Sequence, residues 1–259
     1  MNIVVLVKQV PDSGEERTLR TDDKTVDRDA ATKRMNELDE NAIEEALKLK
    51  EEHGGEVTLL TMGPGDATDT IRKALSMGPD KAVHVTDEAL HGSCAVATSK
   101  VLAAALGKLE WDLVLCGAEA TDGRVQAIPH MLSERLGVGA ATGARKVTVA
   151  GGTVTVERQT DEGYEVTQTE TPAIVSVTDT INEPRYASFK LIMAAKKKPV
   201  ESYALADLGV SADEVGLANA TSQVLEFAPK PPRQAGVKVS DDGEGGVKLV
   251  EYLASEKLV

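Results

Sequence analysis

Residues 2–9 read NIVVLVKQ, a nearly unbroken aliphatic run at the start of the chain. A strand that is covered on both faces needs apolar side chains at successive positions, which is typical of parallel sheets. Similar short runs recur along the chain at residues 56–62, 81–85, 112–116 and 173–177. We therefore expect residues 2–9 to form the first strand of a buried parallel sheet.

Segments with helical periodicity separate these runs. From Asn36 onward, apolar residues recur on one helical face and charged residues on the other. Asn36 is placed to cap this helix, with Asp39 three positions later, and Gly54-Gly55 is placed to end it. Further helices are expected at residues 67–77, 93–106 and 125–136. Strands that alternate with helices at this spacing predict an α/β fold with a doubly wound, mostly parallel sheet of the Rossmann-like kind.

Two segments depart from the alternation. Residues 10–33 are polar and acidic, which predicts a long irregular excursion, and long loops in compact domains are often functional. Between residues 146 and 169 the hydrophobic period changes to two around short glycine-containing turns. This period predicts a small antiparallel meander attached to the parallel sheet.

The chain loses strong periodicity beyond Pro199, and residues 227–246 are rich in proline, glycine and charge. We expect an extended C-terminal arm that packs on another surface, because such a segment cannot build a core of its own. A short helix is expected at residues 247–254. We thus divide the chain into an α/β nucleotide-binding domain, residues 1–198, and an arm, residues 199–259.

Composition excludes several classes of protein. The chain has 259 residues with 42 Asp and Glu against 29 Lys and Arg, a formal net charge of −13, which disfavours binding to nucleic acid. No apolar stretch approaches the roughly 18 residues of a membrane span, so no membrane insertion is expected. The first residues contain no basic leader, and we expect a cytoplasmic protein.

Hydrolytic and metal chemistry are also disfavoured. The two cysteines, Cys94 and Cys116, form no CxxC motif, and no GxSxG motif is present. The four histidines show no metal or triad spacing. We therefore predict no catalytic residue and no metal site.

Residues 182–198, NEPRYASFKLIMAAKKK, combine an apolar cluster with a basic run, and we call this segment the docking loop. Pro184 removes a backbone donor and favours an extended start. Opposite charge on an acidic chain would steer an acidic partner to this face. The alternative is an ordinary helix under the fold with a solvated lysine tail. The predicted docking residues are Asn182, Glu183, Pro184, Arg185, Tyr186, Phe189, Ile192, Met193, Lys196, Lys197 and Lys198.

Three loops are candidates for binding a nucleotide. In an open α/β sheet, ligands bind beyond the carboxyl ends of the strands, where amides of helix N-termini converge. The loop after Gln9, the Gly63-Pro64-Gly65 loop and the loop at residues 117–126 all have this position. The GxGxxG motif is missing, which disfavours a standard dinucleotide-binding dehydrogenase. A plain connection between strand and helix is the alternative for residues 117–123.

Several segments resemble one known family. The docking loop contains N-E-P-R-Y and I-M-x-A-K-K-K, which resemble the partner-recognition loop of electron transfer flavoprotein beta subunits. The similarity extends to residues 2–11, 63–64, 71–78, 156–165 and 172–176, with Thr167 where an aliphatic residue is usual. It thus covers most of the chain.

The resemblance implies an electron carrier subunit rather than an enzyme. Such a chain forms a heterodimer with an alpha subunit, shares FAD with it and holds a structural AMP. It accepts electrons from acyl-CoA or related dehydrogenases and passes them to a membrane quinone oxidoreductase. The resemblance also places the segment from Asn36 to Asp39 and the loop near Ser13 close to the flavin. The adenine-nucleotide site would consist of Leu6, Asn36, Glu37, Leu38, Asp39, Met62, Gly117, Thr121, Asp122, Gly123, Arg124, Val125, Gln126, Ala127 and Ile128.

The chain departs from the family pattern in the last of these segments. Many AMP-binding members carry Asn-Gln-Thr-Gly where this chain has Gln126-Ala127-Ile128-Pro129. Electron-bifurcating members place a second FAD here, and Asp122-Gly123 with Ile128 partly matches their pattern. AMP and a second FAD are therefore both open, as is a stand-alone ATP- or AMP-binding module.

Overall fold

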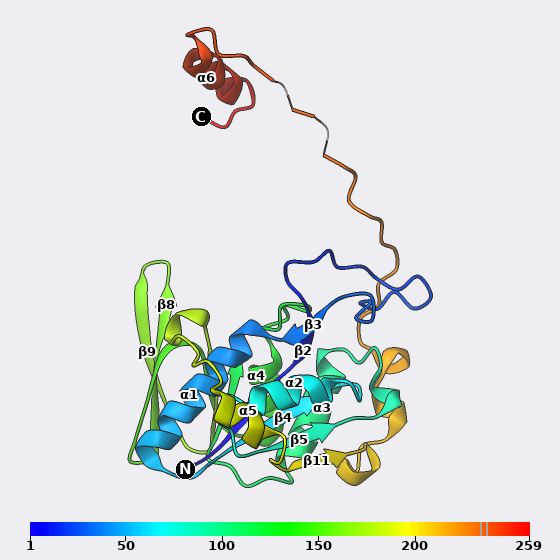
Figure 1. Ribbon diagram of the computed structural model, residues 1–259, viewed down its shortest axis with the longest axis vertical. Helices are drawn as coiled ribbons and strands as arrows, with labels where there is room; N and C mark the ends of the chain where they lie inside the picture. The colour runs from blue at the N-terminus through cyan, green and yellow to red at the C-terminus, as the bar shows by residue number, and fades with distance from the viewer. Residues whose placement is uncertain (234, 237) are drawn as a thin grey trace. The chain divides into compact units, whose positions relative to one another are not determined.

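The computed structural model describes residues 1–233, 235–236 and 238–259. The chain divides into two compact units, Met1–Val224 and Leu225–Val259, and each is described by itself. The first unit contains one large sheet with its helices, and the second contains the helix α6 (Gly245–Ser255). Figure 1 shows the elements of both units.

The large sheet has nine strands in the order β11-β5-β4-β1-β6-β10-β7-β8-β9. From β11 through β7 all neighbouring strands are parallel, whereas β7, β8 and β9 form an antiparallel meander. The predicted α/β class with a mostly parallel, doubly wound sheet is confirmed. The strands are β1 (Asn2–Leu6), β4 (Glu56–Met62), β5 (Lys81–Val85), β6 (Leu113–Gly117), β7 (Gly139–Ala150), β8 (Thr153–Thr160), β9 (Gly163–Glu170), β10 (Ala173–Val177) and β11 (Val200–Tyr203).

Helices cover both faces of the sheet, which explains the aliphatic composition of β1. Ile3 and Val5 belong to the apolar core under α1 (Glu37–His53), α2 (Ala67–Leu75) and the end of α5 (Phe189–Ala195). Val4 and Leu6 belong to the opposite core, under α3 (Ala95–Leu106) and α4 (Ile128–Leu136). Successive residues of a strand point to opposite faces, so both faces of β1 must be apolar.

Short elements connect these layers. The strands β2 (Gln9–Pro11) and β3 (Lys33–Met35) form an antiparallel ribbon at the base of the excursion, so the run at residues 2–9 is divided between two strands. Within the excursion only an isolated bridge between Leu19 and Val26 is found among the described residues. Five 3-10 turns complete the first unit, at Glu88–Leu90, Asp179–Ile181, Ala206–Leu208, Ala212–Glu214 and Leu217–Asn219.

The order of the strands determines where a ligand can bind. The chain runs from β1 to β4 and β5, then crosses back to form β6 on the other side of β1. This reversal of strand order makes the carboxyl ends of β1 and β6 a topological switch point, which is the usual ligand position in doubly wound sheets. The polar segments that follow β1 and β6 therefore form the candidate site.

The predicted division into a domain of residues 1–198 and an arm of residues 199–259 stays a prediction, because the arm is expected to pack on another chain. Within the first unit, β11 pairs with β5 along the edge of the sheet. Within the second unit, α6 leaves a set of apolar side chains exposed, namely Val247, Leu249, Val250 and Tyr252.

Candidate functional site

Asn36 connects the start of α1 to the loop that follows β6. Its side-chain amide donates to the Glu119 carbonyl at 2.9 Å, and its oxygen accepts from the Thr121 N–H at 3.0 Å. Asn36 occupies the N-cap position of α1 but makes no side-chain cap bond, so the predicted capping role is wrong. The buried amide instead satisfies backbone groups of the loop at residues 117–128, which we call the switch loop.

Asp39 extends this connection to both strand ends. Its carboxylate accepts from the Lys8 N–H at 2.8 Å and from the Asn36 amide at 2.9 Å. Burial raises the pKa of Asp39 to about 7, although hydrogen bonds from Asn36 and from the backbone N–H groups of Lys8 and Gly117 oppose that rise. The start of α1 is thus fixed against the ends of β1 and β6.

Gly117 permits this close approach. A Cβ atom at residue 117 would lie 2.7 Å from the Asp39 carboxylate and 2.7 Å from the Leu38 Cβ. Such distances require the neighbouring atoms to move, and one of these neighbours is part of the buried polar network. Glycine at the end of β6 is therefore a packing requirement of the site.

Asp122 anchors the middle of the switch loop, and its side chain is fully buried. Lys8 Nζ donates to it at 2.8 Å, and the Arg28 guanidinium donates to its other oxygen. Burial by itself would raise the pKa of Asp122, but Lys8 and Arg28 hold that pKa below its ordinary value. Two cations on one carboxylate leave one positive charge in excess beside the loop. Because Arg28 lies in the excursion, this contact also connects the excursion to the switch loop.

The end of the switch loop offers unpaired donors. In the described part of the chain, the backbone N–H groups of Gln126, Ala127 and Ile128 have no protein acceptor. Gln126 has a φ of 58°, whereas Ala127 is right-handed, and such an alternation is typical of backbone segments that bind anions. The three N–H groups lie at the start of α4, whose dipole favours negative charge at this end.

Thr121 adds a further unpaired group. Its buried Oγ1 has no hydrogen-bond partner among the described residues. A buried hydroxyl without a partner carries a free-energy cost that a bound ligand could remove. The hydroxyl, the free N–H groups and the excess positive charge together fit a ligand that carries phosphate and hydroxyl groups.

The structure brings the predicted nucleotide-site residues together at one edge of the sheet. Leu6, Met62 and Gly117 lie at the carboxyl ends of β1, β4 and β6, and the residues from Asn36 to Asp39 lie at the start of α1. In the switch loop, Gly123, Arg124, Val125 and Gln126 are exposed. Lys8 and Arg28 were missed by the sequence analysis. The only signal was that Lys8 is charged directly after an aliphatic strand.

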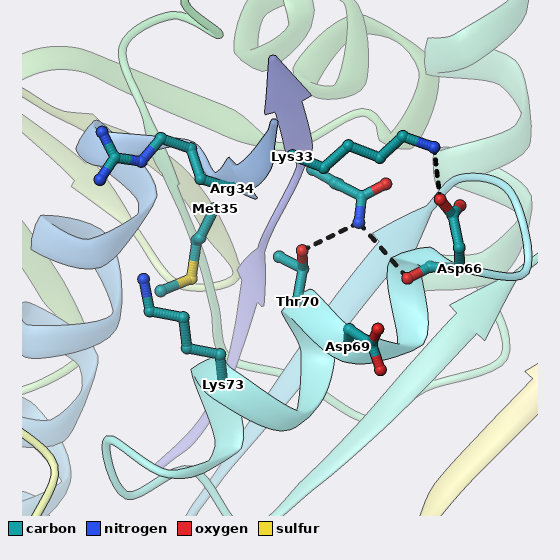
Figure 2. Close-up of a pocket in the computed structure, with 8 residues that line it drawn as sticks. Lys33, Arg34, Met35, Asp66, Asp69, Thr70 and Lys73 are labelled. Carbon is teal, nitrogen blue, oxygen red and sulfur yellow. Dashed lines mark hydrogen bonds and ion pairs between the residues drawn. The ribbon is translucent and has the colours of Figure 1, made fainter. Parts of the chain in front are cut away.

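A separate pocket of about 260 Å³ lies beside the start of α2 (Figure 2). Its three basic side chains are already paired, because Lys33 contacts Asp66, Arg34 contacts Asp12 and Lys73 contacts Glu40. Gln9 closes the other side by donating to the Thr70 hydroxyl at 3.1 Å. This pocket is therefore a polar junction between the β2–β3 ribbon and α2.

The docking loop is fastened to α1 at its beginning. Asn182 exchanges hydrogen bonds with Asn41, and its amide also donates to Glu45 at 3.1 Å. Arg185 forms ion pairs with Glu44 at 2.7 Å and with Glu51 at 2.6 Å. These two predicted docking residues therefore hold the loop on the fold.

The apolar residues of the docking loop lie on the surface. Tyr186 is 99% exposed and Phe189 is 79% exposed, while Ile192 and Met193 are each close to half exposed. Phe189 is the first residue of the short helix α5, and its exposure shows that it is not a core residue. Lys196 and Lys197 are exposed beside this group, as are Glu183 and Lys190, whereas Lys198 points toward the end of α2.

A mostly parallel sheet with helices on both faces, without the GxGxxG motif, places this chain in the class of doubly wound α/β folds. Residues 23–208 match the family model described as the electron transfer flavoprotein domain.

Full-length relatives make this assignment specific. The chain is 52% identical to the electron transfer flavoprotein subunit beta of Mycobacterium tuberculosis (strain ATCC 25618 / H37Rv), over 100% of this chain and 99% of the relative. It is 50% identical to the subunit of the same name from Mycobacterium leprae (strain TN), with the same coverage. It is 34% identical to the caffeyl-CoA reductase-Etf complex subunit CarD of Acetobacterium woodii, over 93% of this chain and 92% of the relative.

The chain belongs to the electron transfer flavoprotein beta subunit family. The resemblance seen in the sequence is thus confirmed. Beta subunits of this family pair with alpha subunits and serve as electron carriers rather than catalytic enzymes.

Two further findings concern the described residues only. None of their helices is both long and apolar enough to cross a bilayer. They also contain no group of three or more His, Cys, Asp or Glu side chains placed to hold a metal ion.

Proposed function

We propose that this chain and an alpha subunit form a cytoplasmic electron carrier that shares one FAD. The carrier takes electrons from acyl-CoA or related dehydrogenases and delivers them to a membrane quinone oxidoreductase. FAD supplies the electron chemistry when it is bound. The chain described here contributes a structural nucleotide site and the surface that recognises the dehydrogenase.

The observation that carries this proposal is the exposed apolar group on α5. Phe189, Ile192 and Met193 are presented by a helix whose flanking residues are fixed to the fold. An exposed apolar group with a polar rim is characteristic of a protein interaction site, and aromatic anchors commonly dominate such interfaces. A self-contained nucleotide-binding module would have no need of this surface.

Charge supports a particular kind of partner. Lys190, Lys196 and Lys197 are exposed around the apolar group, although the formal net charge of the chain is −13. A partner with an acidic rim and an apolar pocket would therefore be steered to α5 and away from the rest of the surface. The name of the Acetobacterium woodii relative places that protein in a complex with a caffeyl-CoA reductase, which is a redox enzyme like the dehydrogenase partner proposed here.

The candidate nucleotide is AMP. The free N–H groups of Gln126, Ala127 and Ile128 would hold the phosphate, and the unpaired Thr121 hydroxyl would bind a polar group of the ligand. Lys8 and Arg28 act indirectly, because they hold Asp122 and thereby the loop. A second FAD is the alternative, since Ile128 has no side-chain donor and Asp122-Gly123 with Ile128 partly matches the bifurcating pattern.

The C-terminal arm would complete the heterodimer. In the second unit, α6 exposes Val247, Leu249, Val250 and Tyr252 without burying any residue. Apolar side chains on a helix with no core of its own need a partner surface. We assign that surface to the alpha subunit.

Co-expression with an alpha subunit tests the proposal. We expect a yellow heterodimer that a dehydrogenase reduces, because the flavin is bound only when both chains are present. This chain purified alone should contain no stoichiometric FAD. A colourless monomer that retains ATP in the presence of the alpha subunit would instead identify a stand-alone nucleotide-binding module.

A further inference from the structure

The helix that presents the apolar docking group is very short. The helix α5 has seven residues, and isolated helices of this length are marginal in water. Only Ala195 of this helix is buried, so its own packing provides little stabilisation. Contacts at its two ends must therefore keep it ordered.

Arg72 holds the C-terminal end of α5. Its Nη1 donates to the Ala195 carbonyl at 2.9 Å and to the Lys198 carbonyl at 2.7 Å. The last carbonyl groups of a helix have no partner within the helix and carry its negative end of the dipole. A guanidinium supplied by α2 therefore binds the last carbonyl of α5 and the carbonyl of Lys198, three residues beyond the helix.

Lys198 makes the reciprocal contact. Its Nζ donates to the Leu75 carbonyl at 3.0 Å and to the Gly78 carbonyl at 3.1 Å, at the C-terminal end of α2. Burial lowers the pKa of the Lys198 ammonium. The C-terminal end of α5 thus binds the Arg72 guanidinium of α2, and the C-terminal end of α2 binds the ammonium of Lys198, which follows α5. We call this pair of contacts the α2–α5 clamp.

The N-terminal end of α5 is fixed by different residues. The Ser188 hydroxyl accepts from the Leu191 N–H at 3.3 Å as a side-chain cap. Arg185, just before it, is ion-paired with Glu44 and Glu51 of α1. The exposed side chains of Phe189 and Met193 therefore lie between two anchored ends.

We propose that Arg72 is a positioning residue for partner docking: through the clamp it holds α5 in the conformation that the partner binds. This inference rests on the docking role proposed above and deepens it. A segment that is ordered before association loses less conformational entropy on binding than one that must be ordered by its partner. Arg72 would thus raise affinity without touching the partner.

The test is Arg72→Ala in the complete heterodimer. Two quantities are measured: the dehydrogenase concentration that gives half-maximal flavin reduction, and hydrogen exchange of the α5 amides. We expect docking about tenfold weaker, corresponding to the loss of one net hydrogen-bonded contact to a charged group, together with faster exchange in α5. Flavin content should stay unchanged, and Arg72→Lys should restore part of the affinity.

Lys73→Ala is the matched control. It removes the same charge from the same helix, but the Lys73 side chain is largely exposed, and among the described residues its one ion pair is with Glu40, at 3.7 Å. Docking and α5 exchange should both remain normal in this variant. An equal loss of docking in Lys73→Ala would show that charge, and not the clamp, determines affinity.

Lys198→Ala keeps the inference testable if Arg72→Ala does not fold. It removes the reciprocal contact from the α5 side and should weaken docking with faster α5 exchange. Normal docking in Lys198→Ala, or in folded Arg72→Ala, would overturn the clamp proposal. If Phe189→Ala still weakens docking in that case, the docking role stands. If Phe189→Ala also docks normally, the docking role itself fails.

Discussion

Gly117 is the residue at which the candidate site is most tightly packed. An added Cβ would lie 2.7 Å from both Asp39 and Leu38, so Gly117→Ala should displace the start of α1. We expect a loss of roughly 1 to 3 kcal/mol in the free energy of unfolding, typical of overpacking, together with weaker nucleotide retention. Chemical denaturation and ligand release measure the two effects.

Gly65→Ala is the control for this change, because nothing lies within 4 Å of a Cβ built there. It should leave stability and nucleotide content nearly unchanged. Equal behaviour of the two variants would contradict the close approach of α1 to the end of β6.

Asp122 makes stability depend on pH. Lys8 and Arg28 hold the pKa of this carboxyl below its ordinary value of 3.8 despite its burial. A lowered pKa stabilises the fold above the ordinary value, and that contribution is lost as pH falls through the folded-state pKa. Asp122→Asn should therefore be less stable at pH 7. As the pH falls below 4, the free energy of unfolding of this variant should decrease less steeply than that of the parent protein. Parallel pH profiles would contradict the role of the ion pairs.

Some residue roles followed from sequence spacing and others did not. The spacing placed Asn36 at the start of α1 correctly, but its side chain serves the switch loop, because a buried amide must satisfy the nearest backbone groups. Lys8 and Arg28 meet Asp122 across separations of 114 and 94 residues. Such contacts depend on the three-dimensional path of the excursion, which has no periodicity to reveal it.

Among the elements, α5 and its flanking residues divide into side chains proposed for docking and side chains that hold the segment on the fold. Phe189 is exposed, whereas Asn182, Arg185 and Lys198 anchor the segment. Phe189→Ala should weaken docking by roughly 2 kcal/mol or more, about thirtyfold in affinity, because aromatic anchors dominate interfaces. The melting temperature and the flavin spectrum of the heterodimer should not change. A large fall in melting temperature with unchanged docking would show that Phe189 supports the core instead.

The strands were the most predictable elements. The structure reproduces the predicted bounds of β4, β5 and β10, because each is a short aliphatic run covered on both faces. The sequence analysis missed β11, since the half-exposed edge sequence VESY carries no apolar pattern. It also left the form of residues 189–195 open, because α5 buries only one residue and owes its ends to distant contacts.

In the whole molecule, the first unit carries two separate candidate sites. The candidate nucleotide site lies at the carboxyl ends of β1 and β6, whereas the proposed docking helix α5 packs against α2 on one face of the sheet. The order of strands and helices was enough to predict the fold class, whereas the edge at which a ligand binds stays a prediction. The binding partner of the C-terminal arm could not be predicted in this way. A segment that has no apolar core of its own indicates that it packs on another surface, but it does not indicate which surface.

The ligand content of the purified heterodimer shows whether this chain holds a nucleotide of its own beside a FAD that both subunits share. Acid release of the ligands, followed by chromatography against standards, gives the number of each nucleotide per heterodimer. We expect one FAD and one AMP per heterodimer. Two FAD and no AMP would contradict the AMP assignment and favour a bifurcating flavoprotein. One FAD without any second nucleotide would contradict the proposed nucleotide site at the switch loop.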